Sequence, residues 1–194
     1  MSVAGELRSV EELLALFELR GARQYYGEEV SLTSHSLQAA QMALRAGASD
    51  PQVAAALLHD VGHMLAEEGE DFTDRGIDDS HEDLAAHWLG TLFSPEVVDP
   101  IRLHVDAKRF LCATNAGYSE GLSPTSQQSL ALQGGPMNDA DAAAFPDLAG
   151  ASQALELRRW DDAAKVPGAK TATLTEHEPL LWALASSFRR SPAR

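Results

Sequence analysis

The chain has 194 residues, 44% of them hydrophobic, and a formal net charge of -14. This length fits one domain with an ordinary core. The charge argues against nucleic acid or an anionic membrane as a partner, because their phosphates would be repelled. Cys112 is the single cysteine, which excludes an intramolecular disulfide and fits a reducing cytoplasm. We find no signal-peptide pattern at the N-terminus and no apolar run long enough to cross a bilayer.

Helix signals follow one another along the chain. Ser9 and Glu12 form a capping-box pattern, and Pro51 stands where the first helical residue of another segment is expected. We expect helices at about residues 9–20, 33–47, 50–63, 80–92, 94–110, 123–134, 147–165 and 178–188, with a short one after residue 138. No segment of strand length alternates in hydrophobicity. The predicted fold is therefore all-α, a single domain of seven to nine helices with its core at about residues 9–190 and a polar C-terminal tail.

A histidine and an aspartate stand side by side at the end of an apolar run, where residues 57–63 read Leu-Leu-His-Asp-Val-Gly-His. On a helix, His59 and His63 would lie on one face, one turn apart. Asp60 would be close enough to share a site with His59. Imidazole and carboxylate together suit Zn, Fe, Mn or Ni better than Mg or Ca.

Four of the seven histidines fall near the ends of four different predicted helices: His35, His59, His81 and His104. Side chains from several helices that point into one core are how helical bundles build metal sites. Asp60 and Asp161 add carboxylates, which makes six candidate ligands. One six-coordinate metal could use them all. Two metals bridged by a carboxylate would leave open positions for a substrate, and Asp60 is the natural bridge.

In this order the six residues resemble the HD-domain superfamily in its dinuclear form, whose fold is an HD-domain helical bundle. Four further patterns resemble the HD-domain oxygenases that cleave the carbon–phosphorus bond of 1-hydroxy-2-aminoethylphosphonates. These patterns are Tyr-x-Gly-Glu at residues 25–28, His-Val-x-x-Lys-Arg at 104–109, a serine-containing helix followed by Gln-Gly-Gly-Pro-Met at 126–137, and Arg-x-Trp-Asp with a nearby lysine at 158–165. The resemblance covers about residues 9–190.

The resemblance implies a mixed-valent di-iron site, Fe(II)/Fe(III), with dioxygen as co-substrate. One iron would take His35, His59, Asp60 and Asp161, and the other would take Asp60, His81 and His104. Tyr25 would occupy the second iron when substrate is absent and swing away when substrate binds.

The resemblance also implies a small hydroxyphosphonate as the substrate. The phosphonate and the reacting face would be held by His63, Lys108, Ser126 and Arg158. Lys108 and Arg158 are local cations that can neutralise a phosphonate inside an acidic protein. The products would be phosphate and either glycine or glycine betaine.

Whether the substrate nitrogen is a primary ammonium or a trimethylammonium stays open at this point. Glu28 would contact it and favours a primary ammonium, whereas a trimethylammonium favours aromatic faces such as those of Tyr25 and Tyr26. The position of Glu28 in the motif tips the expectation slightly toward the primary amine.

Other functions compete with this one. An HD phosphohydrolase acting on a nucleotide or phosphomonoester would need neither Tyr25 nor dioxygen. An oxygenase of the inositol-oxygenase type would leave Lys108 and Arg158 unexplained, and a nucleotide sensor would be expected to have lost ligands.

Further residues are expected to lie outside the site or to have supporting roles. His87 and His177 are expected outside it, Arg159 is the rival of Arg158, and Lys165 is expected to pair with Asp161 four residues before it.

Overall fold

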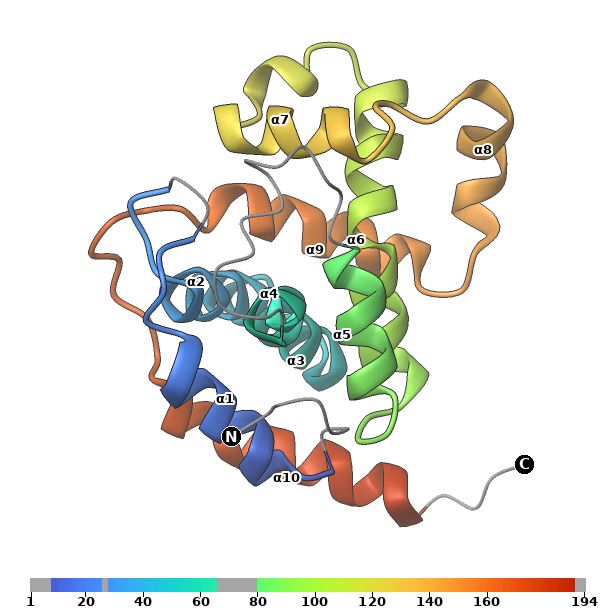
Figure 1. The fold of residues 1–194 in the computed structure, drawn as a ribbon. Helices are drawn as coiled ribbons and strands as arrows, with labels where there is room; N and C mark the ends of the chain where they lie inside the picture. Colours follow the sequence, from blue (N-terminus) through green and yellow to red (C-terminus); the bar gives the residue numbers. More distant parts are fainter. Residues whose placement is uncertain (1–7, 26–27, 66–79, 191–194) are drawn as a thin grey trace.

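The chain is described by a computed structural model that covers residues 8–25, 28–65 and 80–190. Within these ranges it forms ten α-helices and two short 3-10 helices, and no strand (Figure 1). The elements are α1 (Val10–Arg20), α2 (Leu32–Arg45), α3 (Asp50–Leu58), α4 (Val61–Leu65), α5 (His81–Leu89), α6 (Pro95–Thr114), η1 (Ser119–Gly121), α7 (Pro124–Leu132), α8 (Asp139–Ala144), η2 (Phe145–Asp147), α9 (Ala151–Ala163) and α10 (Leu174–Arg190). The all-α prediction is confirmed.

Local sequence sets the helix ends. The Ser9 hydroxyl accepts a hydrogen bond from the Glu12 amide and begins α1, and the Gly21 amide donates to the Phe17 carbonyl at its end. Proline occupies the first turn of α3, α6 and α7, where its missing N–H costs no hydrogen bond. These signals explain why so much of the helix order is readable from the sequence.

The helices α2, α3 and α4 form the centre of the molecule (Figure 1). The pair α5 and α6 packs against α3 and α4, and α9 crosses both α2 and α6. At one end α1 lies beside α10, and at the other end α7 and α8 extend beyond the central helices (Figure 1). The centre is thus flanked by α5, α6 and α9, which carry candidate ligands, as α2 does within the centre.

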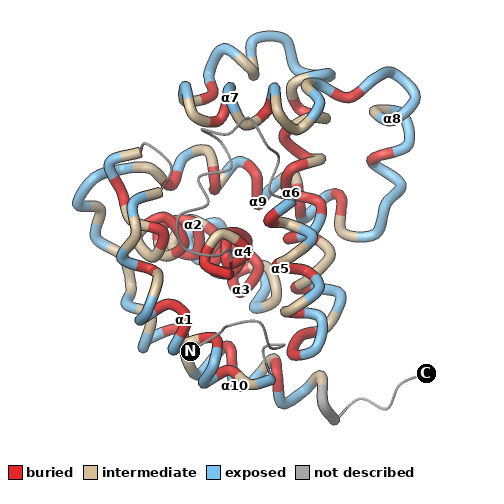
Figure 2. Tube along the Cα trace, in the orientation of Figure 1, coloured by how far each residue is buried: buried red, intermediate tan, exposed pale blue. Residues whose placement is uncertain are grey.

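Residues 53–58 of α3 are all buried, and Figure 2 shows the burial concentrated in these central helices. Ala54, Ala55 and Ala56 let neighbouring helices approach closely. A second, smaller core joins α6 to α9 around Phe145. Close packing on every side of α3 holds the residues that follow it in fixed positions.

The expected helix at residues 50–63 is divided in two, which raises the count from nine to ten. The α-helix stops at Leu58, and a helix resumes at Val61. The His63 amide donates to the Asp60 carbonyl, a tighter turn than an α-helix makes. Gly62 packs directly on α5, where an added Cβ would lie 2.0 Å from the His81 carbonyl oxygen. This tertiary contact is invisible in the local pattern.

Two other boundaries differ from expectation. The helix expected from residue 147 begins at Ala151, because Gly150 adopts a left-handed conformation with φ 84°. The last helix begins at Leu174, earlier than expected. Tyr26, Gly27 and the acidic segment 67–79 lie outside the described residues. None of the helices within the described ranges is long and apolar enough to cross a membrane.

Candidate metal centre

The six predicted ligands come from five separate places in the fold. His35 lies in the first turn of α2, His81 is the first residue of α5, and His59 and Asp60 occupy the break between α3 and α4. His104 lies in the middle of α6 and Asp161 near the end of α9. All six are at least 94% buried. The bundle therefore brings together side chains that are up to 126 positions apart, from 35 to 161.

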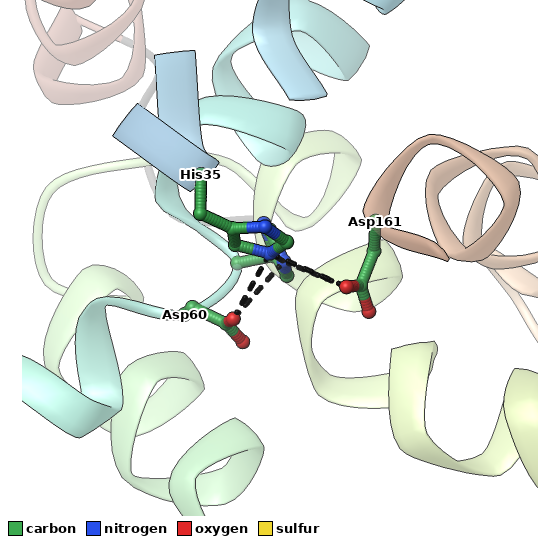
Figure 3. A group of neighbouring side chains, drawn as sticks. His35, Asp60 and Asp161 are labelled. Carbon is green, nitrogen blue, oxygen red and sulfur yellow. Dashed lines mark hydrogen bonds and ion pairs between the residues drawn. The ribbon is translucent and has the colours of Figure 1, made fainter. Parts of the chain in front are cut away.

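Four of these side chains form a first group around His35 (Figure 3). Its Nε2 lies 3.1 Å from His59 Nε2, 3.3 Å from Asp60 Oδ2 and 3.3 Å from Asp161 Oδ1. All four ligand atoms lie within 4.8 Å of one another. Bonds of about 2.0–2.2 Å from one metal ion would separate neighbouring ligand atoms by roughly 3 Å. The spacing of the group fits a single ion.

A second group surrounds the other oxygen of Asp60. Asp60 Oδ1 lies 3.5 Å from His81 Nε2 and 3.6 Å from His104 Nε2, and these two nitrogens are 3.1 Å apart. His63 Nε2 lies 3.9 Å from the same oxygen, and its ring stacks on His81 with centroids 3.8 Å apart. Asp60 thus presents one oxygen to each group, which is the arrangement that a bridging carboxylate requires.

The histidine tautomers suit metal binding. Nδ1 of His35, His59 and His104 lies 3.0, 3.0 and 2.7 Å from a backbone carbonyl. The three carbonyls belong to Ala164, Ala56 and Ile101. A carbonyl only accepts, so in the neutral form of each ring Nδ1 carries the proton and Nε2 offers its lone pair to the group. With both rings neutral, the lone pairs of His35 and His59 would face each other across 3.1 Å, a contact that a proton or a metal cation relieves.

The carboxylates of Asp60 and Asp161 also need a cation. Asp60 Oδ2 and Asp161 Oδ1 are buried and accept no well-formed hydrogen bond from the described residues. Buried carboxylate oxygens are costly unless they are paired or coordinate a metal. Both oxygens point toward His35 (Figure 3). The residues present therefore fit a metal ion.

The electrostatics of the cluster favour a cation. Burial alone would raise the pKa of Asp60, but the charge of His59 and a hydrogen bond from the His35 ring hold this pKa well below its usual range. Burial opposes protonation of His59, yet Asp60 and Asp161 outweigh it and raise the pKa of His59 to about 10. Burial, and then the charge of His81, lower the pKa of His104 and keep it a neutral ligand. A metal ion would supply the positive charge that a proton otherwise provides.

Tyr25 lies against this cluster. Its ring stacks on His35 with centroids 4.0 Å apart. Burial raises the pKa of its hydroxyl well above the usual value, and the charge of Asp60 and a hydrogen bond to it add to the shift. The structure thus brings Tyr25 beside Asp60, and the family resemblance implies a gating ligand at this tyrosine.

Lys108, Arg158 and Lys165 form a cationic cluster next to the ligands. Lys108 is buried and donates to Ser129 Oγ at 2.8 Å. Lys165 donates to Ser126 Oγ at 2.8 Å. Burial, and then the charge of Arg158, lower the pKa of Lys108 to about 8. These three cations and two hydroxyls lie close to the predicted ligands, and together they suit an anion.

Arg158 is buried on α9, whereas Arg159 is exposed. Its Nη1 lies 2.7 Å from Asp161 Oδ2, and its Nη2 donates to Asp162. The Tyr118 hydroxyl also donates to Asp162. The sequence reasoning missed Asp162 and Tyr118. The four-residue spacing from Arg158 signals Asp162, but nothing local signals Tyr118.

Three remaining expectations have clear outcomes. Lys165 does not pair with Asp161 as predicted: α9 ends at Ala163, so the helical spacing no longer applies, and Lys165 turns to Ser126 and Glu28. His177 lies buried in α10, one residue before the point where the last helix was expected to begin. His87 is exposed on α5 and away from the cluster, as expected.

The fold and the site define a helical protein with a buried cluster of histidine and aspartate side chains that can bind metal. The HD domain model matches residues 32–133, and the chain belongs to the HD-domain family.

Curated relatives extend the likeness over most of the chain. The hydroxymethylphosphonate dioxygenase of Gimesia maris is 44% identical over 170 residues, which cover 86% of this chain and 85% of the relative. The [1-hydroxy-2-(trimethylamino)ethyl]phosphonate dioxygenase (glycine-betaine-forming) of Leisingera caerulea is 37% identical over 172 residues, covering 89% and 88%. An uncharacterized protein of Acanthamoeba polyphaga mimivirus is 27% identical, covering 82% and 74%.

Proposed function

We propose that this protein is an HD-domain dioxygenase that uses dioxygen to break the carbon–phosphorus bond of a 1-hydroxyphosphonate. The observation that carries the proposal is the placement of Asp60, whose two oxygens face two groups of histidines 3.3 to 3.6 Å away, beside a buried cationic cluster. The relatives that act on phosphonates support it.

Iron is the metal we propose for the two groups, as a mixed-valent pair. His35, His59, Asp60 and Asp161 would hold one ion, and Asp60, His81 and His104 would hold the other. When bound, iron supplies the capacity to bind and reduce dioxygen, which the side chains lack. Tyr25 would complete the second iron before substrate arrives.

The chain's own part is to bind and orient the phosphonate. Lys108 and Arg158 oppose its negative charge, and Ser126 offers a hydroxyl to its oxygens. Arg158 is held by Asp161 and Asp162, so its position is fixed relative to the metal ligands. His63, 3.9 Å from Asp60 Oδ1, is placed to hold a proton or the substrate hydroxyl near the reacting carbon.

Two classes of substrate share the 1-hydroxyphosphonate group. Hydroxymethylphosphonate has no nitrogen, and its reaction with one dioxygen gives formate, phosphate and one proton without any further reductant. A 1-hydroxy-2-aminoethylphosphonate would give glycine, or glycine betaine if trimethylated, and would place its nitrogen near Glu28. Glu28 lies 3.4 Å from Lys165 in this structure, and an assay with both classes of compound distinguishes them.

The test is the dependence of phosphate release on oxygen. Iron-loaded protein is mixed with hydroxymethylphosphonate, with and without dioxygen, and phosphate, formate and oxygen uptake are measured. We expect equal amounts of the three in air and no phosphate under anaerobic conditions. Phosphate release without oxygen, from this compound or from a phosphomonoester, would instead identify a metal-dependent phosphohydrolase.

A further inference from the structure

A hydrogen bond between Tyr118 and Asp162 ties the segment that connects α6 to α7 to the helix α9. Tyr118 ends a turn after α6, in which its amide donates to the Asn115 carbonyl at 3.1 Å and Gly117 has a φ of 83°. Glycine adopts this left-handed conformation without strain. The Tyr118 hydroxyl donates to Oδ2 of Asp162 near the end of α9. The turn therefore brings a phenol to the side of α9 that carries Arg158.

Asp162 uses its other oxygen for Arg158. Nη2 of Arg158 donates to Asp162 Oδ1, and Nη1 lies 2.7 Å from Asp161 Oδ2. The two acids follow the arginine by three and four positions, the spacings at which side chains of one helix meet. Both terminal nitrogens of the guanidinium are thus held by carboxylates, which fixes the plane of this flat group.

One donor of Arg158 is left over. Its Nε is buried and donates no well-formed hydrogen bond to any of the described residues. A buried donor without a partner costs free energy, and an anionic ligand that accepts from it would remove that cost. Burial, and then the charge of Arg158, lower the pKa of Lys108, so the two cations lie close enough to act on one anion.

We propose that Tyr118 and Asp162 are positioning residues for the phosphonate: they hold the guanidinium of Arg158 in the orientation in which its remaining donor meets the anion. Neither of them would contact the substrate. The inference rests on the proposed function, because it takes Arg158 as a phosphonate ligand.

The negative charge of Asp162 gives the inference a sign that can be tested. A carboxylate near an anion site repels the anion, so charge alone predicts that Asp162→Asn strengthens binding. Positioning predicts the opposite. An asparagine side chain has one acceptor oxygen, which cannot serve both Tyr118 and Arg158, and its amide group would face one of these two donors. Loss of the contact should then weaken binding although a negative charge has been removed.

The affinity for hydroxymethylphosphonate is measured by calorimetry on the iron-loaded protein without oxygen. We expect a loss of about tenfold in Asp162→Asn and of about three- to tenfold in Tyr118→Phe. Asp162→Glu keeps two acceptor oxygens and should stay within about threefold of wild type. Tighter binding in Asp162→Asn would show that charge governs the effect, and it would overturn the inference.

A second background tests whether Tyr118 acts through Arg158. If it does, Tyr118→Phe should change the affinity by less than about twofold in a protein that already carries Arg158→Met. An equal loss in the presence and absence of Arg158 would overturn the inference. If Arg158→Met does not fold, the direction of the change in Asp162→Asn and the rescue by Asp162→Glu still decide the question.

Iron content separates support of the anion from support of the metal ligands. Iron is counted in each variant, and a loss of iron together with affinity in Tyr118→Phe would contradict the proposed role. Asp139→Asn removes an exposed carboxylate on α8 and should leave the affinity unchanged. Wild-type protein that binds the compound but consumes no oxygen would refute the oxygenase and leave the positioning role to the affinities. Wild-type protein that binds neither this compound nor inorganic phosphate would overturn the inference itself.

Discussion

Arg158 and Asp161 join the cationic cluster to the metal ligands. Nη1 of Arg158 lies 2.7 Å from Asp161 Oδ2, while Oδ1 of the same carboxylate faces His35 at 3.3 Å. One carboxylate thus contacts a buried cation on one side and, on the other, the group of side chains that we propose to hold a metal. Both side chains are at least 95% buried, so solvent does not screen the coupling between them.

The role of Asp161 can be measured directly. Asp161→Ala removes a ligand from the first group only, and we expect the protein to lose about one metal ion per chain, counted by mass spectrometry of the metal. The matched control is His87→Ala, since His87 is exposed on α5. Retention of two ions by Asp161→Ala would show that Asp161 is not a ligand.

Tyr25→Phe tests the gating ligand. The substitution keeps the ring that stacks on His35 and removes the hydroxyl that bonds to Asp60. We expect the absorption spectrum of the resting iron protein to change before substrate is added, while the iron content stays the same. An unchanged spectrum would exclude Tyr25 from the coordination sphere.

The charge of Lys108 is expected to make KM depend on pH. Its pKa is lowered to about 8, so the side chain is cationic below that pH and neutral above it. Because the cation opposes the phosphonate, we expect KM to rise as the pH increases through about 8. Lys108→Met should raise KM by about ten- to a hundredfold and abolish the rise. Lys108→Arg should keep a low KM at higher pH. A pH-independent KM in the wild type would contradict this role.

We predict that any side chain at Gly62 lowers the stability of the fold, because Gly62 packs directly on α5. An added Cβ would lie 2.0 Å from the His81 carbonyl oxygen, a backbone atom that cannot rotate away. Gly62→Ala should therefore lower the free energy of unfolding by about 1–3 kcal/mol or more, measured by denaturant titration. At Gly121 an added Cβ meets nothing within 4 Å, so Gly121→Ala should stay within about 0.5 kcal/mol of wild type. Equal stability of the two variants would refute the close contact.

Local signals predicted most of the helices, and they singled out six side chains that the structure brings together. N-cap residues and prolines mark the helix starts in the local sequence. The candidate ligands stand out because histidines recur near the ends of the predicted helices. The break at His59 and Asp60 was missed, and Gly62 just after it makes a close contact with α5 that the local sequence does not show. Sequence patterns are interpreted one segment at a time, so they cannot show a contact between two helices.

The partners of Lys165 show the same limit. Spacing of four residues predicted Asp161, but the helix ends at Ala163 and the lysine is no longer on its surface. Its actual partners, Glu28 and Ser126, are 137 and 39 positions away. The choice of Arg158 over Arg159, open in the sequence, follows from which face of α9 is buried.

The most direct test of the account is the state of the metal in protein purified without oxygen. Iron is counted per chain and examined by Mössbauer spectroscopy, in the wild type and in Asp60→Ala. We expect two irons per wild-type chain with the spectrum of a magnetically coupled pair, and loss of the coupling in Asp60→Ala, since Asp60 faces both groups of histidines. A single uncoupled ion per wild-type chain would contradict a shared carboxylate.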